Sequence, residues 1–327
     1  MIILKFAVLG IPLYGLMLYA FFFPMNYMPV EYSMWREEKD YISKEQGADT
    51  LIIGDSRAKS GIMTRALGDE DTYNMAIGGC TPIEMYYALE GYLKNNPPPK
   101  RVIIIFAQYH LCDIDNWGQT MTYNYLTLPQ LLEVYGEAEK NGESQVLGEH
   151  FFTDLFSYKL RLPNKYLSSI YNANINGRYG DNAAKYESVR QDGGYTVFGE
   201  DEGNDGLSYE VHHPEFDSLK TVLDYYYRLL ELCSSNGISV IIEQAPVNES
   251  SMERISEDFW KGYGSFMSDV KSRYPDFQIV ETVPEYENRY FGDNNHLNKE
   301  GAGVFTEYIK NRYYDMDREE TELNGEN

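Results

Sequence analysis

The chain has 327 residues, of which 51 are acidic and 28 basic, so its formal net charge is −23. Nucleic acids require basic patches that neutralise their phosphates, and this charge argues against them as partners. It equally disfavours flat adhesion to an anionic lipid surface. The acidic residues form clusters typical of solvated loops, so a neutral or amine-bearing polymer remains compatible with the composition.

An uncharged, apolar stretch runs from Phe6 to Phe23. Its length is close to that needed to cross a bilayer, and it predicts a single transmembrane helix within residues 1–24. Lys5 precedes the stretch, which favours an internal amino terminus and places most of the chain outside the cytoplasm. A cleaved secretory signal is the alternative. No small-residue cleavage site follows Phe23, so an uncleaved anchor is favoured.

Beyond a predicted amphipathic stalk in residues 25–48, short apolar runs alternate with segments of helical period. This alternation predicts an α/β domain over residues 49–314 with a flavodoxin-like parallel sheet between two helical layers. The predicted strands are Thr50 to Ile53, Thr72 to Ala76, Arg101 to Ala107, Ser239 to Glu243 and Phe277 to Glu281. The acidic residues 315–327 lack an apolar period, which predicts a disordered tail.

The first predicted strand leads directly into Gly54, Asp55, Ser56 and Arg57. A strand that ends in this way can lift the serine hydroxyl above the carboxyl edge of a parallel sheet, where open α/β folds place their ligands. The alternative is an ordinary turn.

Two glycines, Gly78 and Gly79, follow the second predicted strand and precede the sequence Thr81-Pro82-Ile83-Glu84. A capping threonine, a proline at the first helical position and a glutamate at the third form a capping box, which predicts a helix through about Lys94. The dipole and free N–H groups at the start of that helix would favour an oxyanion beside the glycines.

About a hundred residues, from about 113 to 215, separate the third predicted strand from the next α/β unit. A crossover needs far fewer, so we predict an insertion at the carboxyl edge of the sheet that walls the active site. Helices are expected near Leu128 to Gly136 and Phe151 to Leu167, followed by a loop from Asn172 to Gly206. His212 and His213 lack other ligands at fixed spacing, so no metal site is predicted.

Apolar residues spaced by three and four predict two helices in the second half of the chain, from Phe216 to Cys233 and from Ile255 to Val270. Asn236-Gly237 is expected to end the first of them. The loop after the fourth strand contains Asn248. A turn that leads from this strand into the following helix would explain an asparagine at this position. Asn298 is expected to cap the last helix.

Asp293 and His296 stand three residues apart just before that last helix. A serine hydroxyl is a poor nucleophile near neutral pH, so it needs an imidazole to accept its proton and a carboxylate to hold that imidazole. One loop can present both partners at this spacing. Together with Ser56, the pair predicts a catalytic triad, although a polar loop that caps a helix would also explain the pair alone.

Three sequence blocks resemble the SGNH (GDSL-like) hydrolase superfamily over nearly the full chain. They are the strand with Gly54-Asp55-Ser56, the segment Asn74-Met75-Ala76-Ile77-Gly78-Gly79, and Asp293-x-x-His296-Leu297-Asn298-x-x-Gly301-Ala302. The resemblance implies the SGNH fold, with Ser56 as nucleophile, His296 as base and Asp293 as its orienting carboxylate. In that family a glycine of the second block and the serine itself donate backbone N–H groups to the oxyanion. By position this glycine is Gly78, or alternatively Gly79.

One block departs from the family pattern, because Gln108 follows the third predicted strand where the family usually has an asparagine. Gln108 is the candidate for the missing oxyanion donor, but its side chain is longer. Loss of one such donor typically slows a reaction about 100- to 1000-fold. The remaining candidates are Asp55, Arg57 and Asn248 as substrate-binding residues. The sequence around Asn248, Pro246-Val247-Asn248, is similar to a motif in membrane-anchored members that modify cell-wall polymers.

The resemblance to those anchored members implies a single-pass membrane protein with an extracytoplasmic serine acyltransferase or esterase domain. It would transfer or remove an acetyl or D-alanyl group on a cell-envelope glycopolymer through an acyl-Ser56 intermediate, with a polytopic membrane-bound O-acyltransferase as partner. Hydrolysis by water uses the same site. A non-catalytic, glycan-binding scaffold with a degenerate site is the other alternative, and no cofactor is expected.

The three cysteines, Cys80, Cys112 and Cys233, form an odd number without paired or metal-ligand spacing. We expect buried free thiols, although the sequence leaves room for one disulfide.

Overall fold

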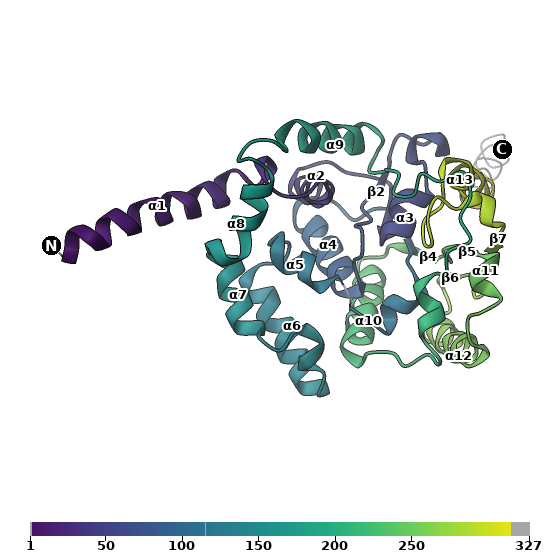
Figure 1. The fold of residues 1–327 in the computed structure, drawn as a ribbon. Coiled ribbons are helices and arrows are strands. Elements are labelled where there is room, and N and C mark those ends of the chain that lie inside the picture. The colour runs from purple at the N-terminus through teal and green to yellow at the C-terminus, as the bar shows by residue number, and fades with distance from the viewer. Residues whose placement is uncertain (1, 115, 315–327) are drawn as a thin grey trace. The chain divides into compact units, whose positions relative to one another are not determined.

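The computed structural model describes residues 2–114 and 116–314, with the backbone alone for residues 2–9. The chain divides into two compact units. Unit 1 contains residues 2–39 and 116–188, and unit 2 contains residues 40–114 and 189–314. Figure 1 gives the labels of the elements used below.

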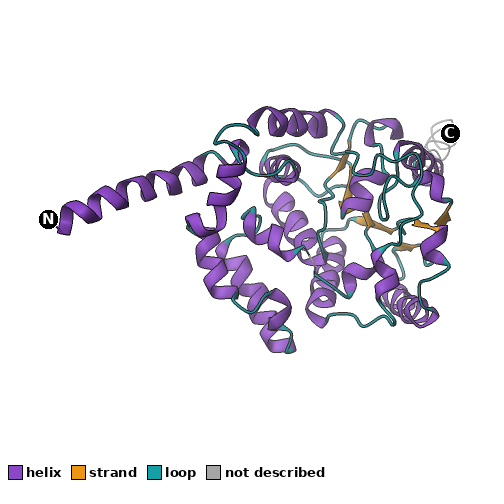
Figure 2. Ribbon diagram, viewed as in Figure 1, coloured by secondary structure: helices purple, strands orange, loops and turns teal. Residues whose placement is uncertain are grey.

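Unit 2 contains a five-stranded sheet in which every pair of neighbouring strands is parallel. The order across the sheet is β2-β1-β3-β4-β6. Figure 2 draws the strands in orange. The strands are β1 (Thr50–Gly54), β2 (Thr72–Asn74), β3 (Arg101–Ile105), β4 (Ser239–Ile242) and β6 (Gln278–Ile279). This is the strand order of flavodoxin-like sheets. The predicted α/β class and the five predicted strands are therefore confirmed, although the observed strands end earlier at their carboxyl ends in four cases.

The helices of unit 2 pack in pairs against the sheet. Helices α3 (Ser56–Gly61) and α13 (Lys299–Tyr313) contact each other and α3 contacts β1, while α4 (Pro82–Asn95) and α10 (Lys220–Ser235) contact each other and the sheet. This arrangement is compatible with three layers. The remaining elements of the unit are α11 (Glu249–Met252), α12 (Glu257–Arg273) and a small parallel sheet of β5 (Val247–Asn248) and β7 (Glu285–Tyr286).

The core of unit 2 follows from the alternation of side chains along the strands. Ile52, Ile103 and Ile241 stand in register on β1, β3 and β4 and belong to one buried cluster. Phe305 and Ile309 of α13 belong to the same cluster. Strands buried in this way read as continuous apolar runs, which is why the sequence revealed them.

Helix termini in unit 2 follow the capping residues. The capping box at Thr81 is present, and Asn298 accepts a hydrogen bond of 3.0 Å from the N–H of Gly301, so both predicted helix starts are confirmed. Helix α10 begins later than predicted. Phe216 lies outside it and packs against Phe259 and Tyr263 of α12. Its apolar side chain stands at helical spacing from those of α10, which is why the sequence predicted an earlier start.

Gly54, the last residue of β1, has no space for a side chain. A Cβ at this position would lie 1.6 Å from the carbonyl oxygen of Ile105 on the paired strand. We expect Gly54→Ala to destabilise the fold by about 4 kcal/mol or more, in the range of severe core substitutions. Gly264→Ala in α12 is the matched control, since a Cβ there meets no atom within 4 Å, and the change should stabilise the helix by about 0.5–1 kcal/mol. Urea unfolding of both variants measures this, and equal midpoints would contradict it.

Unit 1 is helical. Its elements are α1 (Ile2–Phe22), α5 (Trp117–Thr122), α6 (Leu128–Asn141), α7 (Phe151–Lys159) and α8 (Pro163–Asn172), and α2 (Glu31–Ser43) and α9 (Tyr179–Gln191) extend from it into unit 2. The single helix predicted from Phe151 to Leu167 is two helices, because Arg161 has a positive φ of 53° and Pro163 starts a new helix. The predicted loop from Asn172 to Gly206 contains α9, whose sequence has no apolar stripe to indicate a helix.

The amino-terminal predictions have different outcomes. Most of the predicted stalk is helix α2, in which Trp35 and Tyr41 are buried, so this segment packs into the fold. Within the described part of the chain, no helix reaches the length and hydropathy needed for a membrane span. The predicted insertion is divided, since residues 116–188 belong to unit 1 and residues 189–215 to the sheet unit. The predicted disordered tail, 315–327, lies outside the described residues.

Candidate active site

The candidate nucleophile lies where β1 meets α3. Asp55 is the N-cap of α3, and its carboxylate accepts a hydrogen bond of 2.9 Å from the backbone N–H of Arg57. This cap starts the helix immediately after the strand. Ser56 is therefore the first residue of the helix, at the carboxyl edge of the parallel sheet.

Ser56 and His296 are 240 residues apart in sequence and form a hydrogen bond in the structure, with 2.7 Å between Ser56 Oγ and His296 Nε2. On the other side of the imidazole, His296 Nδ1 lies 2.8 Å from Asp293 Oδ2. An ionised carboxylate can only accept, so Nδ1 carries the proton and Nε2 is left to accept the serine O–H. The three predicted triad residues thus lie together in the order that nucleophilic catalysis requires.

The loop that carries Asp293 and His296 is held by its own backbone. Asp293 Oδ1 accepts hydrogen bonds of 2.8 Å from the N–H groups of Asn295 and His296, and the N–H of Gly292 donates to the His296 carbonyl oxygen at 2.9 Å. Burial alone would raise the pKa of Asp293, but the hydrogen bond and charge of His296 and the backbone N–H groups lower it below its usual value. The carboxylate therefore stays ionised beside the imidazole.

Backbone N–H groups are available for an oxyanion beside Ser56. Among the described residues, the N–H groups of Ser56, Gly78 and Gly79 make no hydrogen bond to the protein. A Cβ on Gly78 would lie 4.0 Å from Ser56 Cβ, which places this glycine next to the nucleophile. The two residues predicted as donors, Ser56 and Gly78, therefore lie next to each other. Gly79 has a positive φ of 70° and turns the chain towards α4.

Gln108 is not aimed at this oxyanion position. Its side chain is fully buried, and its amide nitrogen donates to Gln244 Oε1 at 3.2 Å. Gln244 Oε1 also accepts a hydrogen bond of 2.7 Å from Tyr263, so the acceptor is held in place. This contact belongs to a buried network and gives no support to the prediction of Gln108 as an oxyanion donor.

Asp55 has a structural role in place of the predicted substrate contact. Its side chain is fully buried, and its Oδ2 accepts a hydrogen bond from the N–H of Ala107 at 2.9 Å and lies 2.9 Å from His110 Nδ1. It thus connects the end of β1 to the segment after β3. Nothing in the sequence indicated that His110 is the partner of Asp55, and the contact became visible only in three dimensions.

The pKa of Asp55 gives its role a measurable consequence. Burial would raise this pKa, but the contact with His110 and the charge of Arg57 lower it below the usual 3.8. A carboxyl whose pKa is lowered on folding contributes stability that is fully present above its unfolded pKa and is lost as the pH falls through the folded pKa. We expect Asp55→Asn to be less stable than wild type at pH 7, with the difference shrinking below about pH 4. Denaturant unfolding between pH 7 and 3 measures this, and parallel stability curves would contradict it.

Arg57 also faces the protein interior. Its guanidinium is paired with Glu210 at 2.7 Å, and the two side chains are 4% and 0% exposed. The same nitrogen donates to Asn295 Oδ1 at 3.0 Å. Because Arg57 follows Ser56 and Asn295 precedes His296, this bond joins the nucleophile helix to the loop of the base. Arg57 is therefore placed to position the triad, in contrast to its predicted contact with substrate.

Asn248 caps a helix and fixes a loop. Its Oδ1 accepts a hydrogen bond of 2.8 Å from the N–H of Ser251, and its Nδ2 donates to the carbonyl oxygen of Gly206 at 2.9 Å. The structure places it as a loop anchor, so the alternative of a turn role is supported over the predicted substrate contact.

Sequence analysis missed Phe198, which lies in the segment predicted as a loop. Its ring centroid is 5.0 Å from that of His296, with 32° between the ring planes. Its Cζ atom lies 3.4 Å from the position that a Cβ on Gly78 would take. The sequence carried no signal for this contact beyond the expectation that the inserted segment walls the site.

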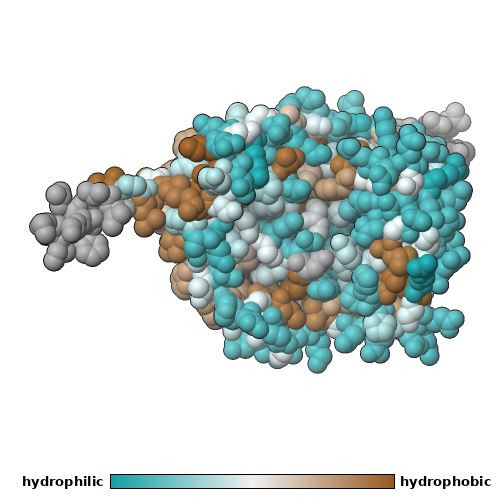
Figure 3. All heavy atoms as spheres, in the orientation of Figure 1, coloured by the Kyte–Doolittle hydropathy of each residue, from teal (hydrophilic) through white to brown (hydrophobic). Residues whose placement is uncertain are grey.

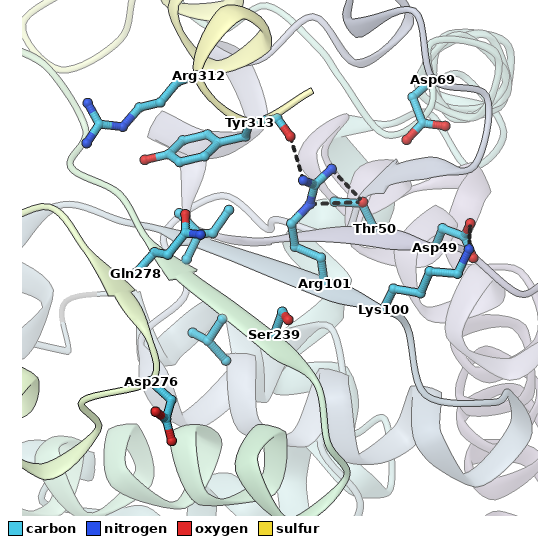
Figure 4. A pocket seen from close by; sticks show the side chains of 12 residues that line it. Asp49, Thr50, Asp69, Lys100, Arg101, Ser239, Asp276, Gln278, Arg312 and Tyr313 are labelled. Atoms are coloured by element: carbon cyan, nitrogen blue, oxygen red, sulfur yellow. Dashed lines mark hydrogen bonds and ion pairs between the residues drawn. The ribbon is translucent and has the colours of Figure 1, made fainter. Parts of the chain in front are cut away.

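A cavity of about 810 Å³ lies at the opposite edge of the sheet (Figure 4). It is lined by residues at the amino ends of the strands, among them Thr50, Arg101, Ser239 and Gln278. Arg101 is held there by hydrogen bonds to Thr50 Oγ1 and to the carbonyl oxygen of Tyr313. The cavity is thus separated from Ser56 by the length of the strands.

All three cysteines are free. Cys80 and Cys233 are buried and Cys112 is partly buried, so the expectation of free thiols is confirmed. Burial raises the pKa of Cys112 and of Cys233 to about 12, which keeps both thiols protonated at neutral pH.

Across residues 2–114 and 116–314, no three His, Cys, Asp or Glu side chains are grouped so that they could hold a metal ion. No family model and no curated protein matches this chain. The site is therefore described by its geometry alone.

Proposed function

We propose that the protein is a membrane-anchored, extracytoplasmic serine acyltransferase or esterase of SGNH type that acts on a cell-envelope glycopolymer. The observation that carries this proposal is the hydrogen-bonded series from Ser56 through His296 to Asp293 at the carboxyl edge of a parallel sheet. The backbone N–H groups of Ser56 and of the neighbouring Gly78, which make no hydrogen bond to the protein, add to it. The resemblance of three sequence blocks to the SGNH superfamily supplies the reaction class.

In the proposed reaction Ser56 Oγ attacks the carbonyl carbon of an ester while His296 Nε2 accepts the hydroxyl proton. The carbonyl oxygen becomes an oxyanion that the N–H groups of Ser56 and Gly78 stabilise. The C–O bond to the leaving alcohol then breaks, and His296 returns the proton to that alcohol. An acyl-Ser56 ester remains, and Asp293 has stabilised the imidazolium throughout.

In the second half a hydroxyl group of the acceptor gives its proton to His296 and attacks the acyl-Ser56 carbonyl. Collapse of the second oxyanion releases the acylated acceptor, and the proton returns to Ser56. A polymer hydroxyl as acceptor gives transfer, and water gives hydrolysis. The site has two backbone donors and no contribution from Gln108, so we expect slower turnover than in a site with three donors.

The proposed membrane location is supported by apolar side chains at the amino-terminal end of the chain. Several large apolar side chains of α1 are exposed among those that the structure describes, from residue 10 onwards. Figure 3 shows hydrophobic residues in brown along this part of the chain. They include Ile11, Leu13, Leu18, Phe21 and Phe22. Such surface in one helix is typical of contact with lipid or another apolar partner, and we propose a membrane-bound O-acyltransferase as the source of the acyl group. Retention of the full chain in alkali-washed membranes, and release of a chain without residues 1–23, tests the location.

A fluorophosphonate probe tests the catalytic proposal, because it reacts only with an activated serine. We expect labelling of the purified protein and its loss in Ser56→Ala. A folded protein that is not labelled would favour the glycan-binding scaffold.

Transfer and hydrolysis are separated in the cell. Acetyl and D-alanyl esters on the cell surface should fall in a strain that carries Ser56→Ala if the protein is a transferase, and should rise if it removes these groups. No change in either ester would rule out both cell-surface roles.

A further inference from the structure

The segment from Gly193 to Asp201 crosses the carboxyl edge of the sheet and touches the elements that carry the catalytic residues. The carbonyl oxygen of Gly193 accepts a hydrogen bond of 2.9 Å from the N–H of Asn74, just after which the chain reaches Gly78. The N–H of Thr196 donates to the carbonyl oxygen of Lys59 in α3 at 3.2 Å. At the other end of the segment, the N–H of Asp201 donates to the carbonyl oxygen of Gly292 at 3.1 Å, directly before Asp293.

The segment is held tightly next to the loop of the base. A Cβ on Gly199 would lie 2.4 Å from the carbonyl carbon of Gly292, so the two backbones are in direct contact. Hydrogen bonds hold the backbone on both sides of Phe198, so the residue has a defined position beside the site.

The ring of Phe198 lies beside both the base and the candidate oxyanion donor. Its plane makes an angle of 32° with that of the His296 ring. A Cβ on Gly78 would lie 3.4 Å from Phe198 Cζ and 4.0 Å from Ser56 Cβ, so the edge of the ring lies next to Gly78. In the proposed reaction, an acyl group bound to Ser56 Oγ would have its carbonyl oxygen at the N–H of Gly78. Because the edge of the Phe198 ring lies next to Gly78, the acyl chain would lie close to this ring.

We propose that Phe198 limits the length of the acyl group, so that esters of short acyl groups react in preference to fatty acyl esters. The inference rests on the proposed acyl-Ser56 chemistry. Its physical basis is that close-packed apolar walls do not yield to additional methylene groups without displacing side chains.

The test compares 4-nitrophenyl acetate, butyrate and octanoate with wild type and Phe198→Ala. We expect wild type to prefer acetate. In Phe198→Ala the ratio of kcat/KM for butyrate to that for acetate should rise by about 15-fold, since butyrate has two more methylene groups and each that gains an apolar environment is worth about a fourfold change. Phe156→Ala is the control, because this aromatic side chain of α7 is 57% exposed and lies outside the proposed site. It should leave the ratio unchanged.

Each outcome decides the inference. An unchanged ratio in an active Phe198→Ala, or a wild-type protein that cleaves octanoate as well as acetate, overturns the role of Phe198 and leaves the triad intact. Absence of any Ser56-dependent reaction in wild type overturns the proposed function and this inference with it. If Phe198→Ala does not fold, Phe198→Leu keeps apolar bulk at the position, and its ratio should rise by about fourfold.

Discussion

Replacing Ser56 by alanine will lower kcat/KM for an acetyl ester by about 10⁴-fold or more, because the change removes the nucleophile itself. His296→Ala should cost a similar factor, since the serine hydroxyl then has no base within hydrogen-bond distance. The double variant should be scarcely slower than either single one, because the two residues act as a unit. Steady-state kinetics with 4-nitrophenyl acetate measure all three.

Two matched variants control for general damage. Ser265→Ala removes a hydroxyl whose hydrogen bond is to its own helix, and His150→Ala removes an exposed imidazole. Both should retain wild-type activity. If Ser56→Ala kept more than a hundredth of the wild-type rate, acyl-serine catalysis at this site would be excluded.

Glu210→Ala will destabilise unit 2 by about 3–5 kcal/mol, the second large effect that the structure implies. The substitution leaves the Arg57 guanidinium buried without its ionic partner. Burial lowers the pKa of Arg57, but the charge and hydrogen bond of Glu210, together with the charge of Asp55, hold this pKa above its usual value in the intact pair. The arginine therefore remains charged, and its unpaired charge is the source of the cost. Urea unfolding at pH 7 measures the loss.

The exposed pair of Lys100 and Asp49 is the matched control, with 2.7 Å between the charged atoms and side chains 79% and 47% exposed. Asp49→Ala should cost at most about 1 kcal/mol, since solvent screens exposed pairs. A double variant with methionine at positions 57 and 210 should recover most of the stability that Glu210→Ala loses. Equal costs for Glu210→Ala and Asp49→Ala would contradict a buried, charged pair.

Arg57 connects this stability to the proposed activity. Its hydrogen bond to Asn295 joins α3 to the loop that ends in His296, so the methionine pair should fold and yet react more slowly with the fluorophosphonate probe. That combination separates positioning of the triad from stability of the fold.

Features that depend only on neighbouring residues could be predicted from the amino-acid sequence. Apolar runs revealed the three central strands β1, β3 and β4, because a parallel strand buried on both faces must be apolar throughout. Thr81 and Asn298 revealed helix starts, because a cap acts within three residues. Ser56, Asp293 and His296 were found for a similar reason, since their short blocks sit directly at the ends of recognisable elements.

The contacts of the side chains around the triad could be seen only in the folded protein. Gln108, Asp55 and Arg57 were placed near the site by their neighbours in sequence, but their partners Gln244, His110 and Glu210 lie on other elements. Phe198 reaches His296 from a segment with no apolar period of its own. The division of the insertion between two units likewise depends on packing. Hydrogen bonds and ring contacts between distant segments leave no periodic trace in a chain, and their partners become known only when the fold brings the segments together.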